Sequence, residues 1–308
     1  MREKPCRLIL ELSHNCNLNC IMCGFGGQPI EKNKFFDEAL FEKILAEKEF
    51  FSNISEIRLN GRGESTISPR FPEIVARVAD YFPDARLSLT SNLMFSNEKI
   101  IDILNEYEID LLISVDSANK NDYESIRKGS DYNLLIERLQ EIEKGHIIFT
   151  LQKYNIDQIQ SIGEFAQKHG LGFILNIIRV DDQNYKNEFN KLLNEKWGLI
   201  LKQLETLHLN IPQKKLFIPD QIWGKKIPEN LATTITSGSL PMCPNAREEL
   251  MIAYDGTIFP CNMFNPHTLG NMIENSLEKI WNSQQRMEFV ENYRDNYYCQ
   301  KCEYMIHK

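Results

Sequence analysis

The sequence predicts an α/β fold built on a parallel β-sheet and followed by a small C-terminal module. Short apolar runs alternate with longer amphipathic runs as far as about residue 210, and parallel strands need such helical crossovers between them. Seven of the eight cysteines gather near the two ends of the chain, with none between residues 24 and 242. Because crossovers are right-handed, the sheet is either an open, doubly wound one or a full or partial barrel. In each case ligands gather at the carboxyl ends of the strands.

Six strand–helix units are expected to follow one another in this first part. The strands are short runs rich in apolar and β-branched residues, at residues 7–12, 54–60, 86–91, 109–115, 146–151 and 172–178. The helices are recognised by apolar residues three and four positions apart, at residues 37–51, 71–82, 97–107, 119–127, 132–143, 156–169 and 186–208. Asp37 is the expected cap of the first helix, and Leu40, Phe41 and Ile44 lie on its apolar face.

The pattern changes after residue 210. Residues 211–238 contain prolines and glycines without a clear period and are expected to form a connector. Residues 249–254 and 257–260 flank Asp255 and Gly256, which predicts a hairpin. Residues 276–293 read as a helix. The expected division is therefore a barrel or sheet domain over residues 1–210, a connector over 211–238 and a small domain over 239–308.

Composition excludes several classes of protein. The chain has 308 residues, 42% of them hydrophobic and 25% charged, which is ordinary for a globular protein. Its net charge of −8 argues against a general nucleic-acid binder, which would normally carry a basic face. We find no run of ~18 apolar residues, and the N-terminus lacks the apolar region of a secretory signal. We therefore expect no membrane partner and a cytoplasmic protein, in which clustered thiols are metal ligands rather than disulfides.

The first cysteine group lies in the loop after the first strand. Cys16, Cys20 and Cys23 have the spacing Cys-x3-Cys-x2-Cys. A [4Fe–4S] cluster is normally held by four thiolates, so three thiolates leave one iron open for a small ligand, as a catalytic cluster requires. The alternative is a structural zinc site completed by His14. Zinc ligands usually come as two pairs on separate turns, whereas these candidates share one loop.

This motif, after the first strand of a βα series, resembles that of the radical S-adenosylmethionine (SAM) superfamily. The resemblance implies a partial (β/α)6 barrel and a catalytic [4Fe–4S] cluster whose open iron binds SAM. It also implies reductive cleavage of SAM to a 5′-deoxyadenosyl radical, which abstracts a hydrogen atom from the substrate. An electron donor such as flavodoxin or ferredoxin is then an expected partner.

The resemblance also implies which residues contact SAM. They lie at or just after the ends of successive strands, or in a region where the family often supplies an arginine: Gly61, Gly63, Glu64, Ser91, Asn92, Ser114, Asp116 and Arg127. The loop at residues 61–64 departs from the family's Gly-Gly-Glu pattern by carrying Arg62 between its glycines. Met22 stands where many members have an aromatic residue near the adenine, and a thioether can also cover a flat ring.

The second cysteine group supplies enough thiols to close a metal site completely. It consists of Cys243, Cys261, Cys299 and Cys302. On spacing alone a zinc knuckle is the alternative. The hairpin, the run Leu269-Gly270-Asn271 and the helix at 276–293 between these cysteines resemble the SPASM domain of radical SAM enzymes, in the shortened "twitch" form with one auxiliary [4Fe–4S] cluster. A closed cluster suits electron transfer or structural support. Cys6 lies at the opposite end of the first strand and is expected to be a packing residue.

Together these features predict a radical SAM oxidoreductase. The expected substrate is a small polyol, aminocyclitol or sugar, with the auxiliary cluster as electron acceptor. The alternative is a SPASM-type cross-link or epimerisation of a ribosomal peptide, and the short segment before the first strand is expected to leave no room for a leader-binding domain. A zinc-stabilised binding protein without catalysis would not explain the order of the thiols along the βα series. Candidate substrate contacts lie near or after the ends of the last two strands: Gln152, Tyr154, Asn176 and Arg179.

Overall fold

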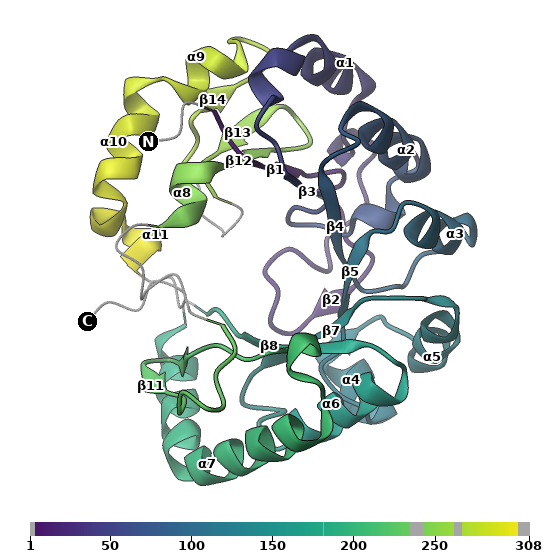
Figure 1. The fold of residues 1–308 in the computed structure, drawn as a ribbon, viewed down its shortest axis with the longest axis vertical. Coiled ribbons are helices and arrows are strands. Elements are labelled where there is room, and N and C mark those ends of the chain that lie inside the picture. Colours follow the sequence, from purple (N-terminus) through teal and green to yellow (C-terminus); the bar gives the residue numbers. More distant parts are fainter. Residues whose placement is uncertain (1–3, 181, 235–242, 262–266, 301–308) are drawn as a thin grey trace.

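The computed structural model describes residues 4–180, 182–234, 243–261 and 267–300. Its frame is a curved sheet whose strands lie in the order β14-β13-β12-β1-β3-β4-β5-β7-β8-β9. Figure 1 shows the crossover helices on the outer side of this arc and the loop that carries β2 on its inner side. The predicted α/β class, with a mostly parallel sheet and a C-terminal module, is confirmed.

The parallel part of the sheet contains the strands expected from the sequence. From β1 to β8, neighbouring strands pair in parallel. Their bounds are β1 Arg7–Leu10, β3 Glu56–Arg58, β4 Arg86–Ser91, β5 Asp110–Ser114, β7 His146–Leu151 and β8 Gly172–Ile177. The predicted bounds of β4 and β7 are confirmed to the residue, and the other strands are shorter than predicted because their ends pass into loops.

The helices that connect these strands also follow the predicted pattern. They are α1 Glu38–Ala46, α2 Phe71–Tyr81, α3 Lys99–Glu106, α4 Lys120–Ile126, α5 Tyr132–Glu141, α6 Ile159–Lys168 and α7 Gln183–Asn210. The Asp37 carboxylate accepts a hydrogen bond from the backbone N–H of Ala39 at 3.0 Å, which confirms it as the cap of α1. The predicted helix at 37–51 ends earlier than expected, and Lys48–Phe51 forms a separate 3-10 turn. None of the described helices is both long and apolar enough to cross a membrane.

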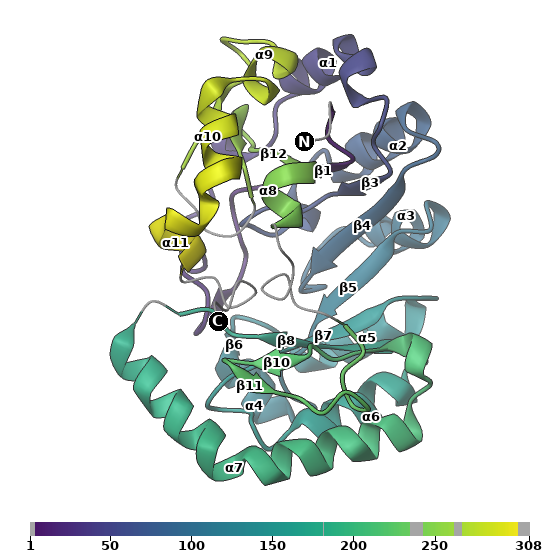
Figure 2. The ribbon, with the colours of Figure 1, turned by 60° about the vertical axis from the view of Figure 1, so that its left-hand side comes forward.

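The C-terminal part extends the same sheet. Strand β12 (Glu249–Ile252) pairs in parallel with β1, so that Ile9 lies opposite Met251. The predicted hairpin is confirmed, because β13 (Thr257–Phe259) pairs antiparallel with β12, and β14 (Gly270–Asn271) follows at the edge. The short helices of this part are α8 Pro244–Glu248, α9 Leu277–Trp281, α10 Gln284–Asn292 and α11 Tyr297–Gln300. Figure 2 shows α8, α10 and α11 on the side of the arc opposite β7 and β8.

Two predictions about this part need correction. The helix expected over residues 276–293 is two helices, because the Ser283 hydroxyl caps α10 by accepting a hydrogen bond from the backbone N–H of Arg286. The connector expected over residues 211–238 contributes a strand, since β9 (Leu216–Phe217) pairs in parallel with β8. It also contains the two-stranded ribbon of β10 (Gln221–Ile222) and β11 (Lys225–Lys226).

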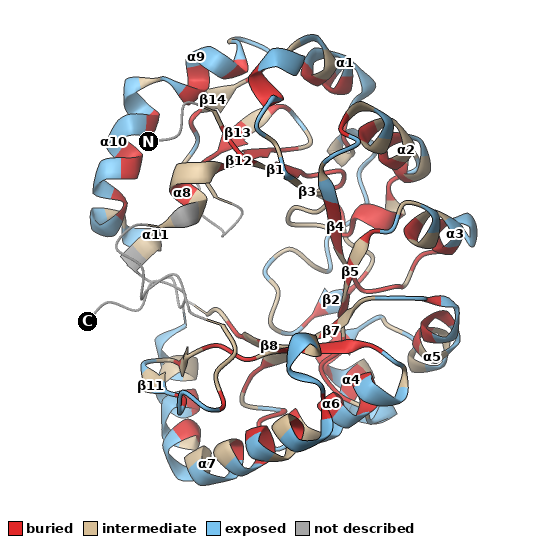
Figure 3. Cartoon of the chain, in the orientation of Figure 1, coloured by how far each residue is buried: buried red, intermediate tan, exposed pale blue. Residues whose placement is uncertain are grey.

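The two faces of the sheet differ in burial. Along β5 and β7, half-buried and buried residues alternate strictly. The buried set, such as Ile113 and Phe149, belongs to the main hydrophobic core under the helices, and Figure 3 shows the corresponding buried stripes on the helices. The half-buried set points to the inner side of the arc. A parallel sheet in an α/β protein normally has both faces covered, so this partly open inner face marks the place for a ligand.

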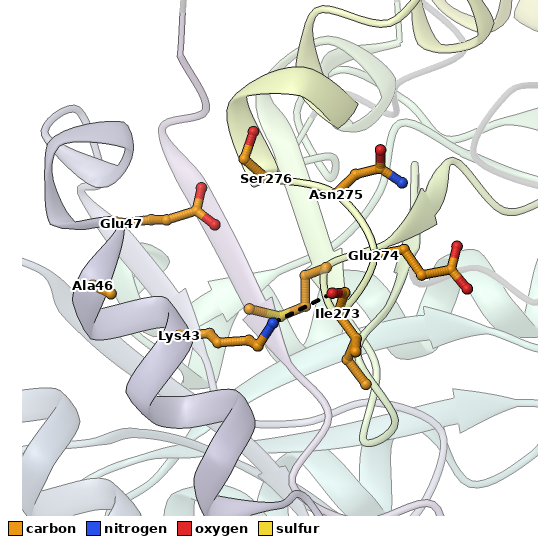
Figure 4. A pocket seen from close by; sticks show the side chains of 8 residues that line it. Lys43, Ala46, Glu47, Ile273, Glu274, Asn275 and Ser276 are labelled. Carbon is orange, nitrogen blue, oxygen red and sulfur yellow. Dashed lines mark hydrogen bonds between the residues drawn. The ribbon is translucent and has the colours of Figure 1, made fainter.

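Helix α1 and the segment before α9 meet at a polar junction. The backbone N–H of Leu277 donates a hydrogen bond to the Glu47 carboxylate at 2.8 Å, and the Lys43 ammonium donates to the carbonyl of Ile273 at 3.4 Å. Figure 4 shows Lys43, Glu47 and Ile273 around a pocket between the two segments. Below it the main core runs on without a break from the parallel strands to Leu250, Ile280 and Trp281. The C-terminal part therefore shares its core with the first part.

Candidate functional site

The loop that carries Cys16, Cys20 and Cys23 begins directly after β1 and is held from two sides. Strand β2 (Asn19–Cys20) pairs antiparallel with β6 (Arg127–Lys128), so that Cys20 lies opposite Arg127. The backbone N–H of Cys23 donates to the carbonyl of Cys20 at 3.0 Å, which closes a tight turn between these two thiols. The structure therefore fixes the cysteine loop at the carboxyl end of the sheet, as the sequence predicted.

The loop after β3 lies against the cysteine loop at very short range. A Cβ atom added to Gly63 would lie 2.2 Å from the carbonyl oxygen of Asn15, and one added to Gly61 would lie 2.4 Å from the Glu11 side chain. The backbone N–H of Glu64 donates to the Asn15 carbonyl at 2.8 Å. Only glycine fits at such approaches. The two glycines therefore let this loop support the segment that leads into Cys16.

The Glu64 carboxylate joins the loop after β3 to the end of β4. One oxygen accepts hydrogen bonds from Thr66 Oγ1 at 2.7 Å and from Ser91 Oγ at 2.9 Å. The other accepts from the backbone N–H of Asn92 at 2.8 Å. Burial raises the pKa of this carboxyl, although these hydrogen bonds oppose the shift. The structure brings Glu64, Ser91 and Asn92 together as predicted, and their contact with SAM stays a prediction.

Asn92 in turn holds the cysteine loop. Its amide Nδ2 donates to Asn17 Oδ1 at 3.0 Å, and the Asn17 amide donates to the backbone carbonyl of Met94. Asn17 and Met94 also line a cavity of about 490 Å³ at this end of the sheet, with Thr66 and Ser68 on its wall. Asn17 was not among the predicted site residues, although its place inside the cysteine motif could have indicated a supporting role.

Asp116 and Arg127 form a buried ion pair beside Cys20. Arg127 Nη2 lies 2.8 Å from Asp116 Oδ2, and Arg127 Nη1 lies 4.0 Å from Cys20 Sγ. The other Asp116 oxygen accepts from the backbone N–H of Thr150 at 2.8 Å. Burial would lower the pKa of Arg127, but the charge of Asp116 raises it above its ordinary value. A charged guanidinium therefore lies against one thiol of the motif, and both predicted residues support the cysteine loop from behind.

The three thiols suit a cluster better than a single ion. Burial raises the pKa of Cys16 to about 12 and also raises that of Cys20, so both are neutral until a metal displaces their protons. His14, the fourth ligand in the zinc alternative, instead bonds to Glu11 Oε1 at 3.2 Å. Three separate thiols on one loop match a cluster, in which each thiolate binds a different iron.

Uncharged polar groups line the inner face of the sheet beyond this loop. Thr90, Ser114, Thr150 and Asn176 are half-buried on β4, β5, β7 and β8, and the Asn176 amide donates to Thr150 Oγ1 at 3.2 Å. Gln152 follows β7 and is fully buried, with neither amide atom hydrogen-bonded in the structure. These residues form a surface for a neutral ligand rich in hydrogen-bonding groups.

The remaining predicted substrate contacts lie further out. Tyr154 is 56% exposed, and the ammonium of Lys153 lies over its ring. Arg179 is half-buried just beyond the end of β8. Whether either touches a substrate stays a prediction.

Glu11 is a site residue that the prediction missed. Its carboxylate is completely buried at the end of β1, where it accepts hydrogen bonds from the backbone N–H of Arg62 at 2.8 Å and of Tyr254 at 3.5 Å. The Arg62 guanidinium then stacks over the ring of Phe259 on β13, 4.1 Å from its centroid. Glu11 and Arg62 therefore connect the cysteine loop to the C-terminal hairpin. A lone carboxylate in an apolar strand was the available signal.

The structure brings the described members of the second thiol group to the C-terminal helices and hairpin. Cys243 directly precedes α8, and it packs against the same small apolar cluster as Cys299. That cluster consists of Ala246, Phe289, Val290 and Tyr293. Cys261 follows β13 directly and is half-buried, whereas Cys302 lies outside the described residues. Thiol sulfur is the natural donor for an iron–sulfur cluster. Cys6 is buried, with its Sγ 3.8 Å from Glu248 Oε2, as expected for a packing residue.

Comparison with known proteins matches both parts of the site. A family model described as the radical SAM superfamily matches residues 10–166. A second model, SPASM, described as an iron–sulfur cluster-binding domain, matches residues 243–303. A relative from Pyrococcus furiosus, a tungsten-containing aldehyde ferredoxin oxidoreductase cofactor-modifying protein, is 23% identical over 90% of this chain and 81% of its own length.

Solved structures share the fold at lower sequence identity. Streptococcus suis SuiB bound to its precursor peptide SuiA superposes with a TM-score of 0.64 at 17% identity, covering 98% of this chain and 70% of that chain. BtrN in complex with AdoMet and 2-DOIA superposes with a TM-score of 0.54 at 15% identity, covering 99% of this chain and 93% of that chain. One neighbour was solved with a peptide and the other with a small molecule, so the fold accommodates both kinds of ligand.

Proposed function

This chain belongs to the radical SAM superfamily, and we propose that within it the protein oxidises a small hydroxyl-bearing molecule, such as a polyol, an aminocyclitol or a sugar. It is an enzyme whose cofactors are SAM and [4Fe–4S] clusters, one in the barrel and an auxiliary one in the SPASM domain. The substrate class, the residues that hold each cofactor and the domain bounds at 1–210, 211–238 and 239–308 are parts of the proposal.

Each thiol group has its own cofactor in this proposal. Cys16, Cys20 and Cys23 hold the catalytic cluster, and the C-terminal cysteines hold the auxiliary one with Cys261 among its ligands. When bound, the catalytic cluster and SAM would supply a 5′-deoxyadenosyl radical, which abstracts the hydrogen atom of a carbinol C–H bond. The hydroxyl group then loses its proton, and the auxiliary cluster would accept the remaining electron, which leaves a ketone. The protein orients the reactants and excludes water.

The chain's own residues prepare this site in two ways. The Glu64 carboxylate bonds to Ser91 and Asn92 and so holds the loops after β3 and β4 together, next to the cysteine loop. The Asp116–Arg127 pair holds Cys20 and places a positive charge beside its sulfur, which favours the thiolate that binds iron.

The observation that carries the choice of substrate is a group of uncharged polar side chains near the carboxyl ends of β4, β5, β7 and β8, on the inner face of the sheet. Thr90, Ser114, Thr150 and Asn176 offer hydroxyl and amide groups on these four neighbouring strands, which suit the repeated hydroxyls of a polyol. A site for hydrogen-bonded hydroxyls rejects analogues that lack them, because its own polar groups would then be left unpaired. The complex of BtrN with AdoMet and 2-DOIA supports a small ligand on this fold.

A second candidate function is the cross-linking or epimerisation of a ribosomal peptide. The complex of SuiB with its precursor peptide SuiA supports this alternative. The partly open inner face could also receive an extended chain. In both functions we expect a one-electron donor of the flavodoxin or ferredoxin type to reduce the catalytic cluster.

The first test is anaerobic reconstitution followed by analysis of iron, sulfide and zinc. We expect about eight irons in the natural chain and about four in a Cys16→Ala/Cys20→Ala/Cys23→Ala variant, with 5′-deoxyadenosine formed from SAM only by the natural chain. A matched Cys243→Ala/Cys261→Ala variant should also keep about four irons but should still cleave SAM. Zinc in place of iron at the C-terminal site would remove the electron acceptor and overturn the oxidation.

Substrate screening then separates the two functions. With polyols and sugars deuterated at the carbinol carbons, oxidation predicts deuterium in 5′-deoxyadenosine and a new carbonyl in the product. Deuterium transfer from a precursor peptide, together with none from any polyol, would favour the peptide-modifying function instead.

A further inference from the structure

The Arg62 guanidinium is held between the segments that carry the two thiol groups. Its position is fixed by two aromatic rings, because it lies 4.1 Å from the ring centroid of Phe259 and 5.9 Å from that of Phe25. Phe25 comes two residues after Cys23, and Phe259 comes two residues before Cys261. The cation therefore bridges the end of the cysteine loop and the strand that leads into the C-terminal thiols.

The ring that Arg62 covers belongs to the inner face of the sheet. Phe259 packs with Ile9 and Met251 in an apolar cluster that is separate from the main core under the helices. Arg62 and Glu64 leave their common loop in opposite directions. Glu64 bonds to residues at the end of β4, whereas Arg62 reaches β13, beyond β1 and β12 in the sheet. Arg62 is thus directed away from the strand end where Glu64 meets other residues expected to contact SAM.

Within the described ranges of the chain, the guanidinium of Arg62 has neither a hydrogen bond nor an ion pair. Its Nε atom is buried without a partner. The nearby Glu11 carboxylate bonds to the backbone N–H groups of Arg62 and Tyr254 and not to the guanidinium. Other arginines that lie over aromatic rings also donate to an oxygen atom: Arg77, Arg138, Arg286 and Arg294.

Stacking alone does not account for an arginine at this position. An apolar side chain could also pack on Phe259, whereas a cation without acceptors for its N–H groups costs free energy. An anionic ligand would offset this cost, because parallel N–H groups of a guanidinium match two oxygens of a carboxylate or a phosphate. Arg62 is half-buried, so its unpaired Nη groups are open to such a ligand.

We propose that Arg62 binds an anionic group of the substrate, a carboxylate or a phosphate, and so determines which hydroxyl-bearing molecules the enzyme accepts. This inference rests on the proposed function, in which the substrate loses a hydrogen atom at the first thiol group and an electron to the cluster at the second. Such a substrate must lie between the two groups, as Arg62 does. The uncharged side chains of Thr90, Ser114, Thr150 and Asn176 then receive its hydroxyl groups.

Binding of matched acidic and neutral probes tests this proposal. The probes are inositol monophosphate beside inositol, and glucuronate beside glucose. Each is titrated calorimetrically into the anaerobically reconstituted full chain, with SAM present and no reductant. We expect at least one acid to bind about tenfold more tightly than its neutral counterpart, as a charge-assisted hydrogen bond implies. The pair that shows the preference also identifies the group as a phosphate or a carboxylate.

Substitutions at Arg62 show whether this cation is responsible. Arg62→Gln should lose the preference for the acid, whereas Arg62→Lys keeps the charge without the planar fork and should retain part of it. Affinity for SAM should be unchanged in Arg62→Gln. Arg70→Gln is the matched control, because Arg70 lies just before α2 and pairs with Glu73 at 2.8 Å. It removes the same charge nearby and should keep the full preference.

A merely structural role gives a different result. If Arg62 only joined the loop to the hairpin, Arg62→Gln would lower the thermal midpoint as much as Phe259→Leu does and would leave the preference for the acid intact. Iron content and the thermal midpoint of each variant show whether it has folded and bound its clusters.

The outcomes separate the inference from the function on which it rests. Equal binding of acid and neutral probe by the natural chain, no binding of either acid, or a preference that persists in Arg62→Gln would overturn the anion-binding role. Loss of SAM affinity in Arg62→Gln would overturn it too, since the cation would then serve the SAM carboxylate. Once reductant is added, oxidation of inositol or glucose without any preference for the acids would keep the proposed function and reject the inference. Arg62-dependent binding of an acid, with no deuterium transferred from any of these compounds, would support the anion site and contradict the oxidation.

Discussion

At the scale of single residues, glycines decide how closely the loops around the cysteine motif approach one another. The family resemblance implies that Gly61 and Gly63 contact SAM, and this contact stays a prediction. In the structure, the side of Gly63 on which a Cβ would lie faces the carbonyl oxygens of Asn15 and Ser13. The close approach that Gly63 allows therefore holds the cysteine loop in place.

Gly63→Ala is therefore expected to displace the cysteine loop. The added methyl group would lie 2.2 Å from the Asn15 oxygen and 2.6 Å from the Ser13 oxygen, and backbone atoms cannot rotate away as a flexible side chain can. Overpacking of this kind destabilises by about 1–3 kcal/mol. In the Cys243→Ala/Cys261→Ala background, which keeps only the catalytic site, we expect the iron content to fall by more than half. In the otherwise natural chain, we expect the iron of the C-terminal site to be retained.

Gly24→Ala serves as the matched control for this substitution. Gly24 follows Cys23 in the same loop, and nothing lies within 4 Å of its added Cβ. Its iron content should equal that of the natural chain. Full iron and undiminished SAM cleavage in Gly63→Ala would contradict the role of close packing.

Arg62 accounts for the departure from the family's pattern of adjacent glycines. Its backbone N–H bonds to Glu11, and its guanidinium reaches Phe259 on the C-terminal hairpin. Sequence reasoning located the departure but not its reason, because the stacking partner lies on a strand almost two hundred positions away in the chain. Such a contact depends on how distant strands pair.

At the scale of elements, local pattern was sufficient for the strands and helices of the first part. Alternating burial and helical caps are properties of short segments, and β4 and β7 end where the sequence predicted. The prediction was wrong where the structure of a segment depends on a contact with another group. Two residues of β9 form a strand only because the edge of β8 is there to pair with them. The break before α10 depends on a single hydroxyl, that of Ser283.

His146, at the start of β7, predicts a dependence of stability on pH. Its ring packs edge-on against Phe217, 5.2 Å between centroids. Burial lowers its pKa and the charge of Lys215 adds to this, although Asp110 opposes the shift. A histidine with a lowered folded-state pKa stays neutral in the folded protein while the unfolded chain takes up a proton near pH 6.5. Stability is therefore full above about pH 6.5 and declines below it.

Thermal unfolding between pH 7.5 and 5.5 measures this effect. The midpoint should fall with pH in the natural chain and fall less in His146→Gln. His169 also has a pKa lowered by burial, so the His146→Gln/His169→Gln double variant should show a still smaller fall. If the midpoint of the double variant falls with pH as steeply as that of the natural chain, the pH dependence comes from other groups.

At the scale of the whole molecule, the two thiol groups are joined by one sheet. The sequence predicted a small module beyond a connector, and its family resemblance supplied the auxiliary cluster. It could not predict that β12 would pair with β1, because parallel pairing between distant segments leaves no local signal. This pairing joins the hairpin that leads into Cys261 to the sheet whose first strand leads into Cys16.

The continuous core predicts that the C-terminal part cannot be removed without harm to the barrel. A chain ending at residue 238 would leave the edge of β1 unpaired and would expose the core side chains that contact Leu250, Ile252 and Trp281. Exposed strand edges of this kind promote aggregation. We expect the shortened chain to be insoluble, or to unfold at a lower temperature than the full chain.

Trp281→Ala is the milder version of the same test. Trp281 is 1% exposed and packs edge-on against Phe50, which follows α1. Truncation of a buried tryptophan destabilises by about 3–5 kcal/mol, and the shared core should transmit this loss to the barrel as one cooperative transition. Leu209→Ala, at a position 87% exposed on α7, should leave the midpoint unchanged. Two separate transitions in Trp281→Ala, with the barrel melting at its natural temperature, would mean that the two parts fold independently and that the sheet pairing adds no stability.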